Sequence, residues 1–118
     1  MGKRMLLVDD AAFMRMKLKQ VLMEQGHEVI GEAANGAEGV EQFVKLRPDA
    51  VTMDITMPIL DGIAAMKQIR QIDPNAVVIM VSAMGQTSFV LEAVNAGAKD
   101  FIVKPFDPER VRKVMESL

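Results

Sequence analysis

Length, composition and charge describe one small folded domain without a basic surface for nucleic acid. The 118 residues are 50% hydrophobic and 25% charged, which is globular rather than disordered composition. A net charge of −2 argues against binding a phosphate backbone, and the lack of Cys excludes disulfides, thiolate metal sites and cysteine nucleophiles. The N-terminal apolar run, Met5–Val8, is too short for a signal peptide or a membrane span, so we expect a cytoplasmic protein without membrane insertion.

Short apolar runs alternate five times with longer segments of helical periodicity, which predicts βα units. Four of the five runs are almost continuously apolar, as in a parallel sheet covered on both faces. The predicted strands are Met5–Val8, Glu28–Glu32, Ala50–Met53, Val77–Val81 and Phe101–Val103. The predicted helices are Ala12–Gln25, Ala37–Leu46, Gly62–Ile72, Thr87–Ala96 and Pro108–Leu118. The second strand carries polar residues and is predicted at a sheet edge, with His27 in the loop before it.

Residues with special backbone preferences support these helix boundaries. Gly26 and Gly97 follow two helices at the position that favours a left-handed backbone. Asp107 and Pro108 form a cap with Pro in the first helical turn. In the first helix, the spacing of Met14, Leu18, Val21 and Leu22 predicts one stripe that faces the sheet.

Polar groups follow four of the five predicted strands. Asp9 and Asp10 follow the first strand, Asp54 the third, Ser82 the fourth and Lys104 the fifth. Because the C-terminal ends of parallel strands meet at one edge of the sheet, we expect these side chains to lie together. Three carboxylates and one ammonium leave about two negative charges, which match one divalent ion, and hard oxygen ligands favour Mg²⁺.

This group of residues has the components for forming an aspartyl phosphate. A carboxylate beside Mg²⁺ can attack phosphorus, and Lys104, Ser82 and nearby backbone N–H groups can hold the phosphoryl oxygens. Each residue alone also has a structural interpretation, because Asp and Ser cap helices and lysines are usually solvated. Unrelated caps have no reason to place acids, a hydroxyl and an ammonium at the ends of neighbouring strands, so the combination favours a site.

The chain resembles bacterial response-regulator receiver domains over nearly its whole length. The motifs that carry the resemblance are Val8-Asp9-Asp10, Met53-Asp54, Met57-Pro58, Asp61-Gly62, Ser82-Ala83 and Lys104-Pro105-Phe106. Within the family, the sequence is most similar to the single-domain chemotaxis regulators. The resemblance implies a flavodoxin-like doubly wound (βα)5 α/β sandwich, in which residues 1–118 form a single receiver domain. It also implies a five-stranded parallel sheet of strand order 2-1-3-4-5.

The resemblance implies a role for each matching residue. Asp54 would be the phosphoacceptor, assisted by Lys104 and Ser82. Mg²⁺ would be held by Asp9, Asp10, Asp54 and the backbone carbonyl of Thr56. The Lys104-Pro105 bond would be cis.

Further roles concern signalling and the lifetime of the phosphorylated state. Ser82 and Phe101 would form the switch, with Phe101 in place of the Tyr that is common in this family. Thr56 and Met84 would flank the attacking water and tune dephosphorylation. The output surface would be formed by the fourth helix, last strand and fifth helix, where Phe89 and Leu91 are either core or part of a docking face.

The resemblance implies a chemotaxis response regulator, a signalling module rather than an enzyme, which assists its own phosphorylation and dephosphorylation. A chemotaxis histidine kinase would supply the phosphoryl group, and the phosphorylated monomer would bind the flagellar motor switch protein. A phosphatase is a further expected partner. The alternatives within the family are a stand-alone phosphorelay receiver and a receiver fragment of a larger regulator.

Two alternatives come from other classes of protein. An aspartyl-phosphate phosphohydrolase would need a second Asp two residues after Asp54, where this chain has Thr56. A flavodoxin-like flavin binder would need a phosphate-binding loop after the first strand, where this chain has two acids. Both are weaker hypotheses than the receiver domain.

Overall fold

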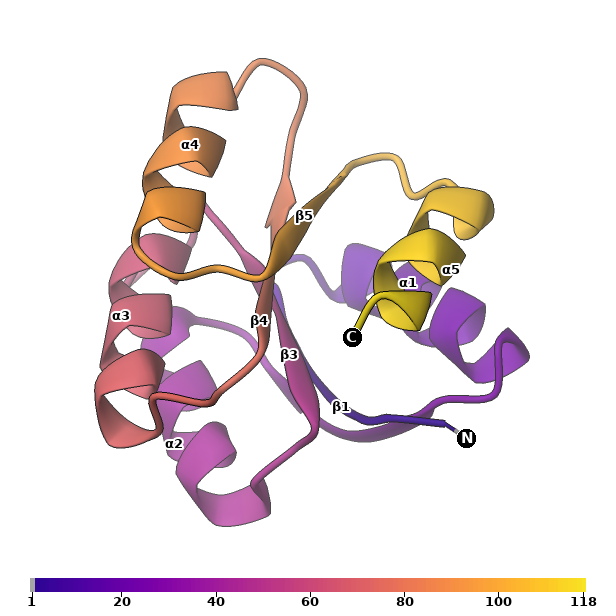
Figure 1. Ribbon diagram of the computed structural model, residues 1–118, viewed down its shortest axis with the longest axis horizontal. Helices are drawn as coiled ribbons and strands as arrows, with labels where there is room; N and C mark the ends of the chain where they lie inside the picture. The colour runs from indigo at the N-terminus through magenta and orange to yellow at the C-terminus, as the bar shows by residue number, and fades with distance from the viewer. Residues whose placement is uncertain (1) are drawn as a thin grey trace.

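Five parallel strands form one sheet with helices on both faces in the computed structural model, which describes residues 2–118 (Figure 1). The strands are β1 (Arg4–Val8), β2 (Glu28–Ala33), β3 (Ala50–Asp54), β4 (Val78–Ser82) and β5 (Asp100–Val103). The helices are α1 (Ala12–Glu24), α2 (Gly36–Leu46), α3 (Gly62–Ile72), α4 (Thr87–Asn95) and α5 (Pro108–Glu116). The strand order β2-β1-β3-β4-β5 confirms the predicted fold class.

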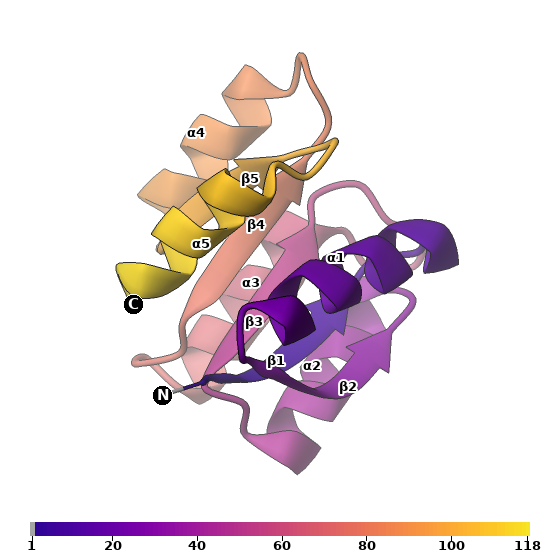
Figure 2. The ribbon, with the colours of Figure 1, turned by 90° about the vertical axis from the view of Figure 1, so that its right-hand side faces the viewer.

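The sheet separates two hydrophobic cores. One core contains side chains of α2, α3 and α4, and the other contains side chains of α1 and α5 (Figures 1 and 2). Successive residues of a strand point to opposite faces. In β1, for example, Leu6 and Val8 belong to the first core, whereas Met5 and Leu7 belong to the second. Strands β3 and β4 are buried throughout because both faces of the sheet are covered.

The predicted helix boundaries are found within two residues of their expected positions. Gly26 and Gly97 have φ values of +90° and +116°, as expected for residues that end helices in a left-handed conformation. The side chain of Asp107 accepts a hydrogen bond from the N–H of Glu109 at 3.1 Å, with Pro108 beginning α5. These local signals fix where the helices begin and end. They therefore also determine which residues lie at the C-terminal edge of the sheet.

Two apolar helices differ from a simple one-sided pattern. In α1, Leu18 and Leu22 are buried, but Met14 and Val21 of the predicted stripe are only half-buried. In α4, Val90 is buried, whereas Phe89 and Leu91 are 48% and 59% exposed. The interpretation that all apolar residues of α4 are core is therefore wrong.

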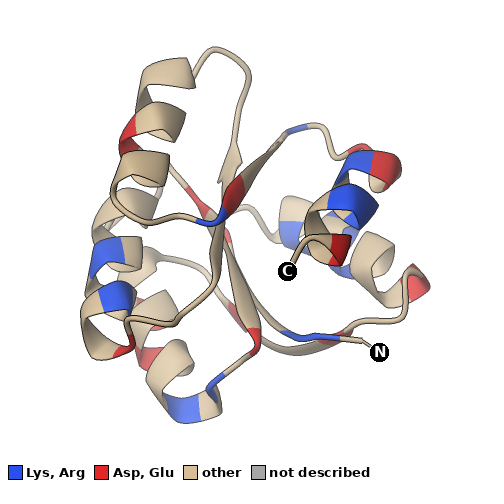
Figure 3. Ribbon diagram, viewed as in Figure 1, with Lys and Arg blue, Asp and Glu red and all other residues tan. Residues whose placement is uncertain are grey.

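The remaining features agree with the expectations for the periphery. Strand β2 lies at a sheet edge, and His27 lies just before it, where its Nδ1 accepts a hydrogen bond from the Lys3 N–H at 3.0 Å. Lys and Arg are distributed over several elements and interspersed with acidic residues (Figure 3). Within residues 2–118, no helix has the length and apolar character needed to span a membrane.

Candidate phosphoacceptor and metal site

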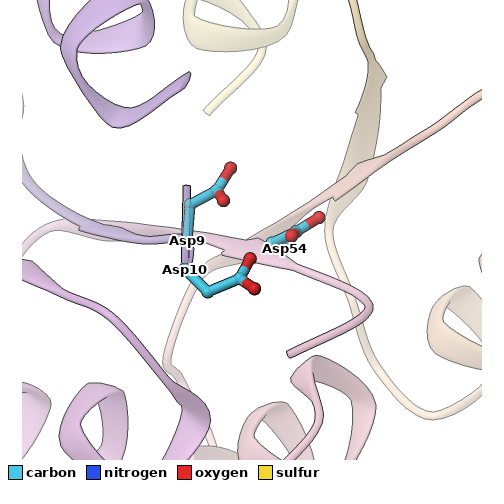
Figure 4. A group of neighbouring side chains, drawn as sticks. All are labelled: Asp9, Asp10 and Asp54. Atoms are coloured by element: carbon cyan, nitrogen blue, oxygen red, sulfur yellow. The ribbon is translucent and has the colours of Figure 1, made fainter. Parts of the chain in front are cut away.

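Three carboxylates lie together at the C-terminal edge of the sheet (Figure 4). Strands β1 and β3 are neighbours, with Val8 opposite Met53, so Asp9 and Asp54 follow at adjacent positions. One oxygen from each of Asp9, Asp10 and Asp54 lies within 4.8 Å of the other two. Asp9 and Asp54 are buried, whereas Asp10 is exposed, so the group opens to solvent on one side.

Lys104 supplies the positive charge of this group from the end of β5. Its Nζ lies 2.8 Å from Asp9 Oδ2 and 3.5 Å from Asp54 Oδ1. Burial lowers the pKa of Lys104, but the hydrogen bond to Asp9 and the charge of Asp54 outweigh that effect, and the pKa lies above its ordinary value. The Lys104-Pro105 bond is cis, as the family resemblance implies.

Asp54 is the carboxylate whose ionisation is disfavoured by its place in the acidic group. Burial and the neighbouring charge of Asp9 raise its pKa from the ordinary 3.8 to about 6, although Lys104 acts in the opposite direction. Above that pH, Asp54 is a carboxylate in a buried and negatively charged environment. A bound cation would relieve this repulsion, and three carboxylate oxygens are a donor set suited to Mg²⁺. The residues present therefore fit the expected metal.

Asp9 is also held in place by hydrogen bonds from outside the acidic group. Its Oδ1 accepts a hydrogen bond from the Ala11 N–H at 2.8 Å, and its backbone carbonyl accepts one from the guanidinium of Arg15. Arg15 in turn forms an ion pair with Glu32 at 3.1 Å. Asp9 thus shapes the turn before α1 through one carboxylate oxygen while its other oxygen faces Lys104. It does not cap the helix, because the N-cap residue of α1 is Ala11 and no side chain in the described part of the chain caps that end.

The predicted switch residues line a common pocket beside the acidic group. Ser82 ends β4 and is 1% exposed, one residue beyond Val81, which pairs with Asp54. A pocket of about 310 Å³ is lined by Ser82, Phe101 and Val90 together with the loop between β4 and α4. Phe101 is half-buried and has the guanidinium of Arg110 5.5 Å from its ring centroid.

The two residues predicted to tune dephosphorylation are both exposed. Met84 is 79% exposed in the loop after β4, and Thr56 is exposed two residues after Asp54. The hydroxyl oxygen of Thr56 accepts a hydrogen bond from Gln86 Nε2 at 2.9 Å. The sequence does not predict this contact of Gln86, because the two partners are 30 positions apart and no periodicity or motif links them.

Gly62 keeps the backbone beside Asp54 in place. Its N–H donates to the carbonyl of Ile55 at 2.8 Å, and a Cβ at this position would lie 1.8 Å from the Asp54 carbonyl oxygen. Any side chain would therefore displace Asp54 or the start of α3.

Comparisons with known proteins agree with this arrangement. The family described as "Response regulator receiver domain" matches residues 5–116. The chain is 60% identical to the "Chemotaxis protein CheY" of Thermotoga maritima over 118 residues, covering all of this chain and 98% of that protein. It is also 60% identical to the protein of the same name from Bacillus subtilis over 111 residues, covering 94% and 92% of the two chains.

Solved structures show the same similarity. The CheY chain of a CheX-CheY-BeF3-Mg complex from Borrelia burgdorferi matches with a TM-score of 0.92 and 40% identity, covering 97% of this chain and 87% of that chain. The response regulator domain of CheB from Thermotoga maritima matches with a TM-score of 0.85 and 40% identity, covering 98% of both chains.

Proposed function

The chain belongs to the response regulator receiver domain family, and from this premise we propose that it accepts a phosphoryl group on Asp54. It is a chemotaxis response regulator, and phosphorylation on Asp is the general mechanism of receiver domains. One observation carries the assignment to Asp54. Its buried carboxylate lies between two further acids and the Lys104 ammonium, which is 3.5 Å away.

The proposed metal ligands are Asp9, Asp10, Asp54 and the backbone carbonyl of Thr56. Mg²⁺ bound there would neutralise the oxygens of the phosphoryl group during its transfer. The exposed side of the group, at Asp10, faces the solvent from which ion and donor arrive. The charge of the carboxylates supports this assignment, because Lys104 balances only one of them.

Phosphoryl transfer then requires few further groups. A carboxylate oxygen of Asp54 forms a bond to phosphorus while the bond from phosphorus to the donor's histidine nitrogen breaks, and the imidazole keeps that electron pair. With its pKa at about 6, Asp54 is mostly the nucleophilic carboxylate at neutral pH. Lys104 would turn from Asp9 to the new phosphoryl oxygens, and Ser82 would donate a hydrogen bond to them.

The same movement would carry the signal to the surface. Ser82 leaves its position beside the pocket, and Phe101, which lines that pocket, turns inward into the space it vacates. The response would be read at α4, β5 and α5, where Phe89 and Leu91 are exposed. Thr56 and Met84 would set how quickly water removes the phosphoryl group, since both flank the site.

The proposed partners follow from this chemistry. A chemotaxis histidine kinase would supply the phosphoryl group, and the flagellar motor switch protein would bind the phosphorylated form. One neighbouring CheY structure is described in a complex with CheX, and we include a phosphatase among the partners of this chain. We further propose a cytoplasmic monomer whose residues 1–118 form one receiver domain and which is not itself an enzyme.

The central test is phosphorylation by acetyl phosphate with Mg²⁺, measured by intact mass. We expect one added phosphoryl group, which is lost in Asp54→Asn and in the presence of a chelator. Asp73→Asn is the matched control, because Asp73 lies after α3, away from the acidic group, and Asn keeps the oxygen that accepts from Asn75. Full labelling of Asp54→Asn would move the nucleophile elsewhere.

A second measurement separates the chemotaxis role from other receiver functions. A peptide from a motor switch protein should bind the phosphorylated chain more tightly than the unphosphorylated chain. Equal affinities, together with rapid phosphoryl transfer to a histidine phosphotransfer protein, would favour a phosphorelay receiver. Continuous release of phosphate from many phosphoesters would favour the phosphohydrolase, a function that Thr56, in place of a second acid, does not support.

A further inference from the structure

Gln86 joins the two loops that flank Asp54. Its Oε1 accepts a hydrogen bond from the Ala83 N–H at 2.7 Å, and its Nε2 donates one to Thr56 Oγ1 at 2.9 Å. Ala83 begins the loop between β4 and α4, and Thr56 lies in the loop between β3 and α3. One side chain therefore ties together loops that are 30 residues apart in the chain.

Gln86 lies just before α4, but its side-chain contacts are not those of ordinary helix capping. Gln86 is the residue before the first turn of α4, yet its side chain forms no hydrogen bond with the backbone of that helix. Capping residues normally use their side chains to satisfy the free N–H groups of the first turn. The side-chain amide of Gln86 instead forms hydrogen bonds with the Ala83 N–H, beside Ser82, and with the Thr56 hydroxyl, near Asp54.

The rest of the loop between β4 and α4 has few restraints of its own. Ala83, Met84 and Gly85 are exposed, Gly85 has a φ value of +88°, and a Cβ on Gly85 would meet no atom within 4 Å. Such a segment can rearrange without breaking packed contacts. Gln86 is thus the side chain that fixes this loop against the neighbouring loop.

The hydrogen bond to Ala83 also occupies a donor at the site. Ala83 carries the first backbone N–H after Ser82, at the edge where Asp54 and Lys104 lie. A phosphoryl group on Asp54 adds oxygens that need hydrogen-bond donors at this edge. The Ala83 N–H cannot turn to them while it donates to Gln86 Oε1.

We propose that Gln86 is a positioning residue that latches the loop after β4 to Thr56 in the unphosphorylated protein. The arriving phosphoryl group competes for the Ala83 N–H, and the latch opens when that group wins. The latch biases the protein toward its resting conformation, and one or two partly exposed hydrogen bonds correspond to a bias of about five- to tenfold. This inference rests on the proposed role of Asp54.

The test uses Gln86→Met, which keeps the length of the side chain and removes both hydrogen bonds. We expect its phosphorylation by acetyl phosphate with Mg²⁺ to be about five- to tenfold faster than that of the wild type. Hydrogen exchange at the Ala83 N–H of the unphosphorylated variant should be faster by a similar factor. Gln71→Met, at an exposed position near the end of α3, is the matched control and should change neither quantity.

Two further measurements separate latching from a general loss of structure. Mg²⁺ affinity should stay unchanged in Gln86→Met, because Gln86 contacts Thr56 only through its hydroxyl. Thr56→Val breaks half of the latch, so Gln86→Met should accelerate phosphorylation less in that background. Strictly independent effects, or a slower or unchanged rate in Gln86→Met, would overturn the latch. If the wild type takes up no phosphoryl group, the assignment of Asp54 as the phosphoacceptor is overturned instead.

Discussion

Replacing Asp54 with Asn should stabilise the metal-free protein at neutral pH. Burial and the charge of Asp9 raise the pKa of Asp54 to about 6, so its ionised form is disfavoured in the folded protein. Asn has nearly the same shape and no charge. It removes the buried repulsion while leaving the contact between Lys104 and Asp9 at 2.8 Å intact.

The size of this effect follows from the pKa difference between the folded and unfolded states. The change from 3.8 to about 6 corresponds to about 3 kcal/mol of free energy of unfolding, at about 1.36 kcal/mol per pKa unit. Asn loses the attraction between Asp54 and Lys104, but the pKa of Asp54 already includes that attraction. We therefore expect Asp54→Asn to raise the free energy of unfolding by about 2 to 3 kcal/mol at pH 7.5.

The pH dependence has a definite sign. Because the folded protein holds the Asp54 proton more tightly than the unfolded chain, this group destabilises the wild type as pH rises from about 4 to about 6. The penalty is complete above the folded pKa and absent well below the unfolded pKa. The advantage of Asp54→Asn should therefore shrink to under about 1 kcal/mol at pH 4.

Urea unfolding followed by circular dichroism, in the presence of a chelator, measures both quantities. Wild type and Asp54→Asn are compared at pH 7.5 and pH 4, and equal m-values show that the mutation has not altered the unfolded state. Glu41→Gln serves as the control for loss of one exposed carboxylate. An equal advantage at both pH values, or a less stable Asn variant at pH 7.5, would refute the assigned electrostatic strain.

Three further predictions concern the metal, the backbone and a helix cap. Mg²⁺ at about one hundred times its Kd should raise the free energy of unfolding of the wild type by about 2.7 kcal/mol, and should raise that of Asp54→Asn clearly less. Equal shifts of the two proteins in thermal or urea unfolding would place the ion elsewhere. Gly62→Ala should cost more than about 2 kcal/mol in urea unfolding, because its Cβ would lie 1.8 Å from the Asp54 carbonyl oxygen, and a neutral effect would contradict that contact. Asn35→Ala should lower the free energy of unfolding by about 1 kcal/mol, because Asn35 Oδ1 accepts a hydrogen bond from the Glu38 N–H at 2.9 Å. Phosphorylation by acetyl phosphate should be unchanged, and its loss would show that this helix cap also shapes the site.

The predicted strands were slightly too short where a strand ends in a polar residue. The apolar pattern ended the third strand at Met53 and the fourth at Val81, but Asp54 and Ser82 belong to β3 and β4. Asp54 pairs with Val81 in the ladder. Hydrophobicity marks which side chains are buried in the core, whereas backbone hydrogen bonds continue for one more residue to the edge where function requires polar groups.

The faces of α1 and α4 were harder to predict than their existence. Both helices carry apolar residues on more than one side, as Phe13 at 60% exposure and Leu91 at 59% exposure show. When apolar residues surround a helix, periodicity does not determine which of them faces the sheet. Packing against the neighbouring elements decides it, and that information is not local in the sequence.

The gathering of Asp9, Asp10, Asp54 and Lys104 could be predicted, but their contacts could not. Sheet topology fixes where each strand ends, and hence which side chains share an edge. It does not fix side-chain rotamers, so neither the closer approach of Lys104 to Asp9 than to Asp54 nor the bridge from Gln86 followed from the sequence. Both contacts depend on which partner competes best for a flexible side chain.

That competition connects the resting contacts to the proposed chemistry. Lys104 and the Ala83 N–H are donors at the sheet edge that holds Asp54, and both are engaged in the resting protein, with Asp9 and Gln86 respectively. Phosphorylation replaces the single charge of Asp54 with about 1.5 to 2 negative charges and three acceptor oxygens. Mg²⁺ bound at the site would meanwhile neutralise part of the negative charge of Asp9. The new group can therefore draw both donors away from their resting partners, and that exchange turns a local gain of charge into movement of the loop after β4.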